Sequence, residues 1–182
     1  AGRYAASPRT VDLRGWARYY NQGCHAVTSF SRAIPAQSLD ARVKNRSRLF
    51  YTLADQEARL VDPDAQVVIL DVDGYVSENK GGNVFVVTKG ELRTPSVDNC
   101  LAGISRATVI ELARELGLTV HETRLLPYDL ATADEAFFTS TPYCIMPATK
   151  FNGLTIGDGQ VGPVTHRLLA AWSARVGLDL VA

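Results

Sequence analysis

The chain is poor in the residues that indicate a disulfide framework, a metal cluster or a membrane span. It has 3 cysteines in 182 residues (Cys24, Cys100 and Cys144), far apart, odd in number and in no metal-ligand spacing. We interpret them as thiols of a protein in a reducing compartment. No apolar run approaches the ~20 residues that a membrane span needs, and no signal-peptide pattern is present. These absences predict a cytoplasmic protein without a metal site.

The chain also lacks an excess of charge of either sign. Lys and Arg total 19, and Asp and Glu total 19, so the formal net charge is zero. A neutral protein has no general electrostatic attraction for nucleic acid or for an anionic membrane, and we predict neither as a partner. The local exception is a run of cations, Arg42, Lys44, Arg46 and Arg48. Such a run is typical of a solvated face or of a pocket for an anionic ligand. No aromatic residues alternate with it, as single-stranded nucleic acid binding would require.

The apolar patterns predict a mixed α/β (α+β) domain with many short strands and flanking helices. Residues 67–71 form a continuous apolar run of strand length. Residues 83–88 and 91–94 flank Lys89-Gly90 and predict a hairpin. The clearest helix covers residues 106–116, and the last helix runs from Pro163 to Arg175.

Two further expectations concern the first half of the chain. Asp40 is a possible helix cap, and the spacing of apolar residues predicts a helix over about 40–58. Lys44 would then lie in the first turns of that helix. We expect residues 1–13 to be a linker-like segment and residues 14–182 to form one domain. The chain begins at Ala1 without an initiating Met, so a fragment of a longer protein is one interpretation.

Three groups of residues could together bind one cofactor. Lys44 offers an amine, and Glu78, after the stretch Asp73-Gly-Tyr-Val-Ser, offers a carboxylate. The stretch Gly103-Ile104-Ser105 precedes the clearest helix, whose free N–H groups can bind an anion. An amine for an aldehyde, an acid for a ring nitrogen and an amide-rich turn for a phosphate are what a pyridoxal phosphate (PLP) enzyme requires. Taken alone, each has a plainer interpretation: a surface lysine, a loop acid, and a serine that caps its own helix.

Other polar residues add less. Thr139-Ser140-Thr141 ends a predicted strand and could supply a second contact to a phosphate, although hydroxyls are ordinary at strand ends. His25, His121 and His166 are scattered along the chain without a partner at ligand or triad spacing. We therefore interpret the histidines as structural.

The order of these motifs resembles the fold type IV, class IV aminotransferases. This family includes branched-chain aminotransferases, D-amino-acid aminotransferases and aminodeoxychorismate lyase. The resemblance extends from about Tyr19 to residues 161–167. It is densest at Asp73 to Glu78 with Asn83-Val-Phe85, at Leu101 to Arg106, and at Ala133 to Thr139. The resemblance implies the PLP-binding large domain of the D-amino-acid aminotransferase-like fold.

The resemblance also implies a role for each matching residue. Lys44 falls where the family places the lysine that forms a Schiff base with PLP. Glu78 falls on the partner of the pyridine nitrogen, and Leu101 on the residue packed against the ring. The remaining candidates are the phosphate contacts Gly103, Ile104, Ser105 and Thr141, and the substrate contacts Arg32, Pro142 and Tyr143.

The implied activity is the transfer of an amino group between an amino acid and a 2-oxo acid, by a homodimer. Two alternatives stay open: a lyase of the aminodeoxychorismate type that releases pyruvate, and an inactive fragment or one half of a two-chain enzyme. Family members have a smaller N-terminal domain ahead of the matching segment, and we expect that domain to be absent from this chain. Leu49 stands where branched-chain aminotransferases tend to have Tyr, and Thr141-Pro142-Tyr143 replaces a loop of small residues. These departures weaken the branched-chain assignment and leave the PLP assignment unchanged.

Overall fold

The computed structural model describes residues 14–181 except residues 46 and 48. The linker-like segment expected at residues 1–13 lies outside the described residues and stays a prediction. The helices are α1 (Arg14–Ala17), α2 (Tyr19–Gln22), α3 (Leu49–Val61), α4 (Ile104–Glu115), α5 (Pro127–Ala131) and α6 (Pro163–Val176). The strands are β1 (Cys24–Arg32), β2 (Gln66–Leu70), β3 (Val76–Glu78), β4 (Asn83–Thr88), β5 (Glu91–Thr94), β6 (Val120–Glu122), β7 (Glu135–Ser140), β8 (Cys144–Phe151) and β9 (Leu154–Thr155).

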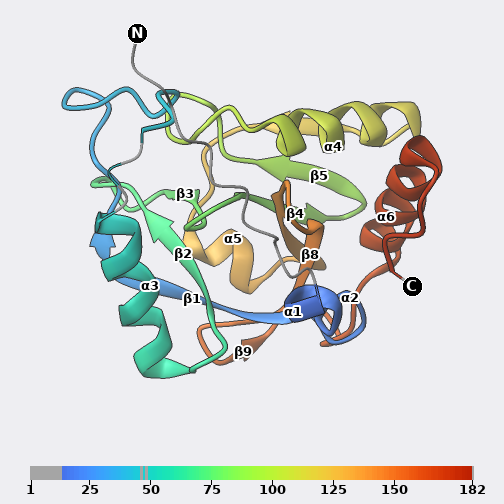
Figure 1. The fold of residues 1–182 in the computed structure, drawn as a ribbon, viewed down its shortest axis with the longest axis horizontal. Coiled ribbons are helices and arrows are strands. Elements are labelled where there is room, and N and C mark those ends of the chain that lie inside the picture. The colour runs from blue at the N-terminus through green and yellow to red at the C-terminus, as the bar shows by residue number, and fades with distance from the viewer. Residues whose placement is uncertain (1–13, 46, 48, 182) are drawn as a thin grey trace, which may run out of the picture.

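Within the described residues, the strands form one nine-stranded mixed sheet (Figure 1). The order is β3-β2-β1-β8-β7-β4-β5-β6, and β9 pairs with β8. Neighbours joined by a short turn are antiparallel, as in β4–β5 and β7–β8. The parallel pairs β1–β2 and β5–β6 are connected through α3 and α4, because parallel neighbours need a long crossover. The predicted mixed α/β class is confirmed.

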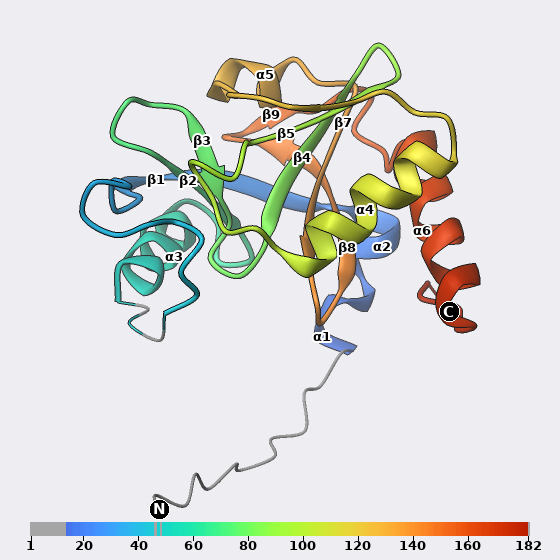
Figure 2. The same ribbon diagram turned by 90° about the horizontal axis from the view of Figure 1, so that it is seen from above.

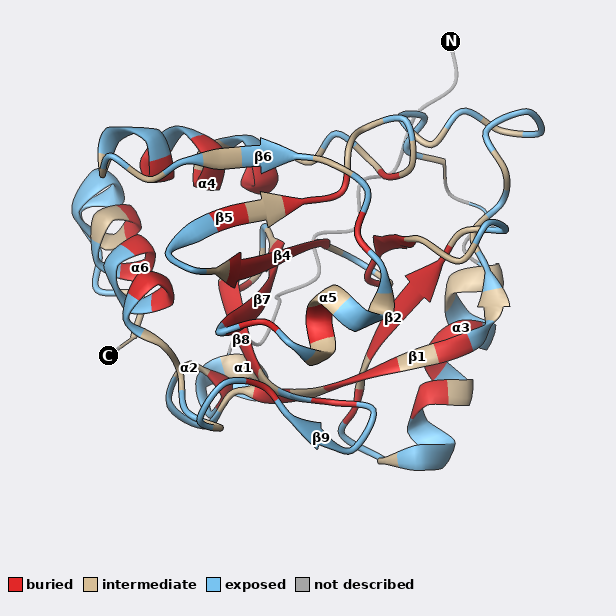
Figure 3. Ribbon diagram, turned by 180° about the vertical axis from the view of Figure 1, so that it is seen from behind, coloured by how far each residue is buried: buried red, intermediate tan, exposed pale blue. Residues whose placement is uncertain are grey.

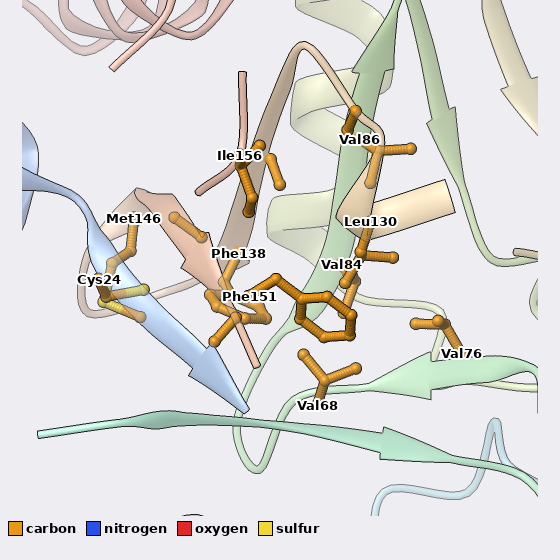
Figure 4. Close-up of a cluster of buried hydrophobic side chains, with 14 of the residues drawn as sticks. Cys24, Val68, Val76, Val84, Val86, Leu130, Phe138, Met146, Phe151 and Ile156 are labelled. Atoms are coloured by element: carbon orange, nitrogen blue, oxygen red, sulfur yellow. The ribbon is translucent and has the colours of Figure 1, made fainter. Parts of the chain in front are cut away.

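The sheet is covered on both sides by buried apolar side chains. One cluster lies inside the curl of the sheet and includes Cys24, Val68, Phe138, Met146 and Phe151 (Figure 4). The other two clusters lie under helices, and Figure 3 shows the buried stripes of α3, α4 and α6 that face them. Helix α3 lies at the opposite end of the molecule from α6 (Figures 1 and 2). The site described below lies between these ends.

Several predicted elements agree with the structure and one does not. The hairpin is confirmed as β4 and β5, and the two clear helices are confirmed as α4 and α6. The helix expected over about 40–58 is wrong in its first half, because α3 begins only at Leu49. The side chain of Asp40 accepts hydrogen bonds from the backbone N–H of Arg42 (2.9 Å) and from its guanidinium (2.6 Å). This local turn competes with a helix start, so Lys44 lies in the loop before α3.

Among the residues that the structure describes, no helix has the length and apolar character to cross a membrane.

Candidate functional site

The residues predicted to bind the cofactor line one pocket, which we call the Glu78 pocket. Its volume is about 500 Å³, within the usual range for small-molecule sites. It is formed by the loop before α3, the turn between β3 and β4, the start of α4 and the end of β7. The predicted residues in its wall are Lys44, Glu78, Leu101, Gly103, Ile104, Ser105 and Thr141. The structure therefore brings the amine, the acid and the turn together, and their roles remain predictions.

Glu78 is a buried acid held by donors on both carboxylate oxygens. It is 8% exposed and ends β3, which pairs with β2 in antiparallel register. The hydroxyl of Tyr51 donates to Oε1, and the backbone N–H of Leu101 donates to Oε2 at 3.2 Å. A carboxylate taken out of water needs such donors. The acid is therefore fixed in place while it still faces the pocket.

The turn that follows Glu78 is braced by its own backbone and side chains. The N–H of Asn79 donates to the carbonyl of Gly82 at 2.8 Å, and the N–H of Gly81 donates to Oδ1 of Asn79 at 3.0 Å. Ser140 joins this turn to the end of β7 by donating its hydroxyl to the carbonyl of Gly81 at 2.6 Å. A Cβ at Gly82 would lie 2.4 Å from the carbonyl oxygen of Thr139. Only glycine allows this approach.

The start of α4 forms the predicted anion-binding end of the Glu78 pocket. The first N–H groups of a helix have no partner within it and attract negative charge. Gly103 is the N-cap residue, without a side-chain capping hydrogen bond. The interpretation of Ser105 as a plain cap is therefore wrong, because Ser105 lies inside the helix and is 9% exposed. A Cβ at Gly103 would lie 2.2 Å from Oδ1 of Asn83, whose amide nitrogen donates to the carbonyl of Leu101 at 2.8 Å.

Lys44 and Lys80 are the two cationic residues among the described residues that line the Glu78 pocket. Lys44 is exposed and reaches the pocket from the loop. Lys80 pairs with Asp55 of α3 at 2.7 Å. Of the other cations in the predicted basic run, Arg42 pairs with Asp40, and Arg46 and Arg48 lie outside the described residues.

A buried hydroxyl in the pocket has no hydrogen-bond partner among the described residues. Thr139 is 1% exposed, lines the Glu78 pocket, and its Oγ1 is unpaired. A buried polar group left without a partner costs about 1–3 kcal/mol. Such an atom is typical of a site that receives a ligand with hydrogen-bonding groups.

The three candidate substrate residues lie in two different places. Pro142 and Tyr143 line a second pocket of about 450 Å³, the Tyr143 pocket. It shares Asn79, Lys80, Gly81 and Ser140 with the Glu78 pocket. Tyr143 is buried, and burial raises the pKa of its phenol above the usual value. Arg32 is exposed at the end of β1, donates to the carbonyl of Ser29 at 2.8 Å, and lines neither pocket.

Tyr51, Asn83 and Thr139 are site residues that the residue types alone did not indicate. Asn83 and Thr139 belong to the motifs that carry the resemblance, so that signal could have selected them. For Tyr51 no sequence signal exists. Its contact with Glu78 forms only when α3 packs against the sheet.

Comparisons with known proteins find a matching family model and similar proteins. Residues 8–151 match the family model described as "Amino-transferase class IV". The chain is 38% identical over 150 residues to "Branched-chain-amino-acid aminotransferase-like protein 2" of Arabidopsis thaliana, covering 82% of this chain and 27% of that protein. It is 38% identical to the branched-chain-amino-acid aminotransferase of Pseudomonas aeruginosa, covering 80% of this chain and 47% of the relative.

The fold is similar to solved structures of the same name. The PLP form of the branched-chain amino acid aminotransferase from Thermobaculum terrenum has a TM-score of 0.82 and 31% identity. This likeness covers 94% of the present chain and 55% of that one. The chain thus spans about a quarter to a half of the length of these relatives.

Proposed function

The chain belongs to the class IV aminotransferase family, and on this premise we propose that it binds PLP and transfers an amino group between an amino acid and a 2-oxo acid. The observation that carries the proposal is the convergence of Lys44, Glu78 and the Gly103–Ser105 turn on the Glu78 pocket. These groups come from three distant parts of the chain. Because they lie together in the wall of one pocket, that pocket suits a ligand that has an aldehyde, a ring nitrogen and a phosphate.

The chemistry of the pocket wall fits this cofactor. The start of α4 offers backbone N–H groups to a phosphate, and Gly103, without a Cβ, leaves room for the Asn83 side chain beside that start. Thr139 adds to the same pocket wall a buried hydroxyl that has no partner among the described residues. Leu101 offers an apolar surface to a ring, and Glu78 offers a carboxylate to a ring nitrogen. The donor set therefore matches the polar groups of PLP.

Each residue then has a defined task. When bound, PLP supplies an aldehyde that combines with amines and a ring that accepts electron density from the substrate Cα. Nζ of Lys44 would supply the amine for that aldehyde, and the same nitrogen would act as the base that moves the substrate Cα proton. Glu78 holds a proton on the ring nitrogen. The α4 N-terminus and the hydroxyls of Ser105 and Thr141 hold the phosphate.

The names of the relatives guide the choice of substrates. They favour an aminotransferase over the lyase alternative, and they make branched-chain amino acids the first donors to test. The assembly that we propose is a homodimer, as the family resemblance implies. The cytoplasmic location predicted from the cysteines is also part of this proposal. No nucleic acid or membrane partner enters it.

A coupled assay tests the reaction. The protein, loaded with PLP, is supplied with a branched-chain amino acid and 2-oxoglutarate, and glutamate formation is followed together with pyruvate release. We expect glutamate, no pyruvate, and loss of activity in Lys44→Ala. Lys80→Ala is the matched control, because Lys80 lines the same pocket and should not supply the amine. Pyruvate release without consumption of the 2-oxo acid would reject transamination in favour of the lyase.

A further inference from the structure

Glu78 accepts a hydrogen bond from a tyrosine that lies outside the Glu78 pocket. Tyr51 lies in the first turn of α3, and its hydroxyl donates to Oε1 of Glu78. It lines the Tyr143 pocket and a cavity of about 30 Å³ next to Glu78, but it is not among the described residues that line the Glu78 pocket. Tyr51 therefore contacts the acid from outside the Glu78 pocket.

This contact restricts the orientation of the carboxylate. The terminal torsion of a glutamate side chain is broad when nothing holds it. Donors on both oxygens, from Tyr51 and from the backbone of Leu101, define one plane for the group. A carboxylate has about four acceptor positions, and Glu78 also lines the pocket. The orientation of the acid toward the pocket therefore depends on the Tyr51 hydroxyl.

The helix that carries Tyr51 is packed against the sheet. Helix α3 buries Ala54 and Ala58 against β2, in a cluster with Val67 and Ile69. Ile69 is in turn the pairing partner of Glu78 in the register of β2 and β3. Tyr51 thus reaches Glu78 from a helix packed on the neighbouring strand. The same helix directly follows the loop that carries Lys44, so one hydrogen bond connects the segment of the amine to the strand of the acid.

We propose that Tyr51 is a positioning residue that acts through Glu78 on the ring nitrogen of PLP and so sets how tightly the protein holds the cofactor. The inference rests on the proposed function. It predicts that the effect of the hydroxyl disappears when either Glu78 or the ring nitrogen is removed.

The test is a thermodynamic cycle of cofactor affinity. Tyr51→Phe removes only the hydroxyl, and we expect the dissociation constant of PLP to rise on the order of tenfold. With the carbocyclic analogue, which has C–H in place of the ring nitrogen, the change should stay under about twofold. It should also stay under about twofold when Tyr51→Phe is added to Glu78→Gln. Tyr19→Phe is the matched control, since the Tyr19 hydroxyl donates to the carbonyl of Asp64, away from both pockets.

The outcomes separate this inference from the function on which it rests. Equal weakening for both cofactors, equal weakening with and without Glu78→Gln, or no weakening would overturn the positioning role. Wild-type protein that fails to bind PLP would instead reject the proposed function.

A second readout needs neither PLP nor a folded Tyr51 variant. In cofactor-free protein labelled at tyrosine Cζ, one tyrosine resonance should shift in Glu78→Gln, because its hydroxyl loses a charged acceptor. An unchanged set of tyrosine resonances would overturn the inference.

Discussion

Gly103 offers a strict test of how the pocket is built. Its φ of −69° and ψ of 140° suit any residue, so alanine would meet no backbone strain. The obstacle is Asn83, because the new Cβ would lie 2.2 Å from its Oδ1. Asn83 is 3% exposed and would have to shift, losing its hydrogen bond to the carbonyl of Leu101. Overpacking costs about 1–3 kcal/mol and the lost hydrogen bond about 1 kcal/mol. Gly103→Ala should therefore lower the free energy of unfolding by about 2–4 kcal/mol.

Urea denaturation of the cofactor-free protein measures this loss. Gly81→Ala is the matched control from the same pocket, since a Cβ added at Gly81 would have no neighbouring atom within 4 Å, and we expect a change within about 0.5 kcal/mol. When Asn83→Ala removes the obstructing oxygen, adding Gly103→Ala should cost less than about 1 kcal/mol. Because the Asn83 shift moves the turn at the start of α4, PLP affinity should also fall on the order of tenfold in Gly103→Ala. A Gly103→Ala protein as stable as Gly81→Ala would show that Asn83 does not obstruct a side chain at position 103.

Three further predictions concern the scaffold and its titratable groups. The buried carboxylate of Glu135 accepts hydrogen bonds from two backbone N–H groups at the start of α6 and from a threonine hydroxyl, so Glu135→Ala should lower the free energy of unfolding in urea by about 2–4 kcal/mol. Glu115→Ala removes an exposed partner of an ion pair and should lower the free energy of unfolding by under about 1 kcal/mol. Cys144 is half-buried and the other two cysteines are buried, so a disulfide reagent should modify Cys144 first in the native protein; simultaneous modification of all three would contradict the burial. The hydrogen bond from His25 lowers the pKa of the Asp62 carboxyl, so the pair stabilises the fold above the unfolded-state pKa of about 4, and this stabilisation is lost as pH falls through the folded-state pKa. Asp62→Asn should therefore lose less stability than wild type on acidification below about pH 4, and equal losses would argue against the pair.

The parts of the fold that depend on neighbouring residues were predictable from the sequence. The β4–β5 hairpin follows from two apolar runs around Lys89-Gly90, and α6 follows from Pro163 and a helical apolar pattern. The parallel pairing of β1 with both β2 and β8 was not predictable, because register between distant segments is set by packing of the whole sheet. The helix expected around Lys44 was wrong for a local reason, the turn closed by the Asp40 side chain.

The candidate site was predictable only as far as its motifs extend. Lys44, Glu78 and the turn at 103–105 stand in a characteristic order along the chain, and the structure gathers them in one pocket. Tyr51 carries no signal, because its role depends on a contact made after α3 packs on the sheet. Arg32 shows the converse, since its place in the sequence suggested a substrate contact and the structure puts it outside both pockets.

We propose above all that the amine of Lys44 and the acid of Glu78 serve one bound PLP. Borohydride reduction of the PLP-loaded protein, followed by peptide mapping, tests it most directly, because reduction makes the bond between lysine and cofactor permanent. We expect the label to lie on Lys44 and to be lost in Lys44→Ala. Label on Lys80, the other lysine of the pocket, or no label after loading with PLP, would contradict it.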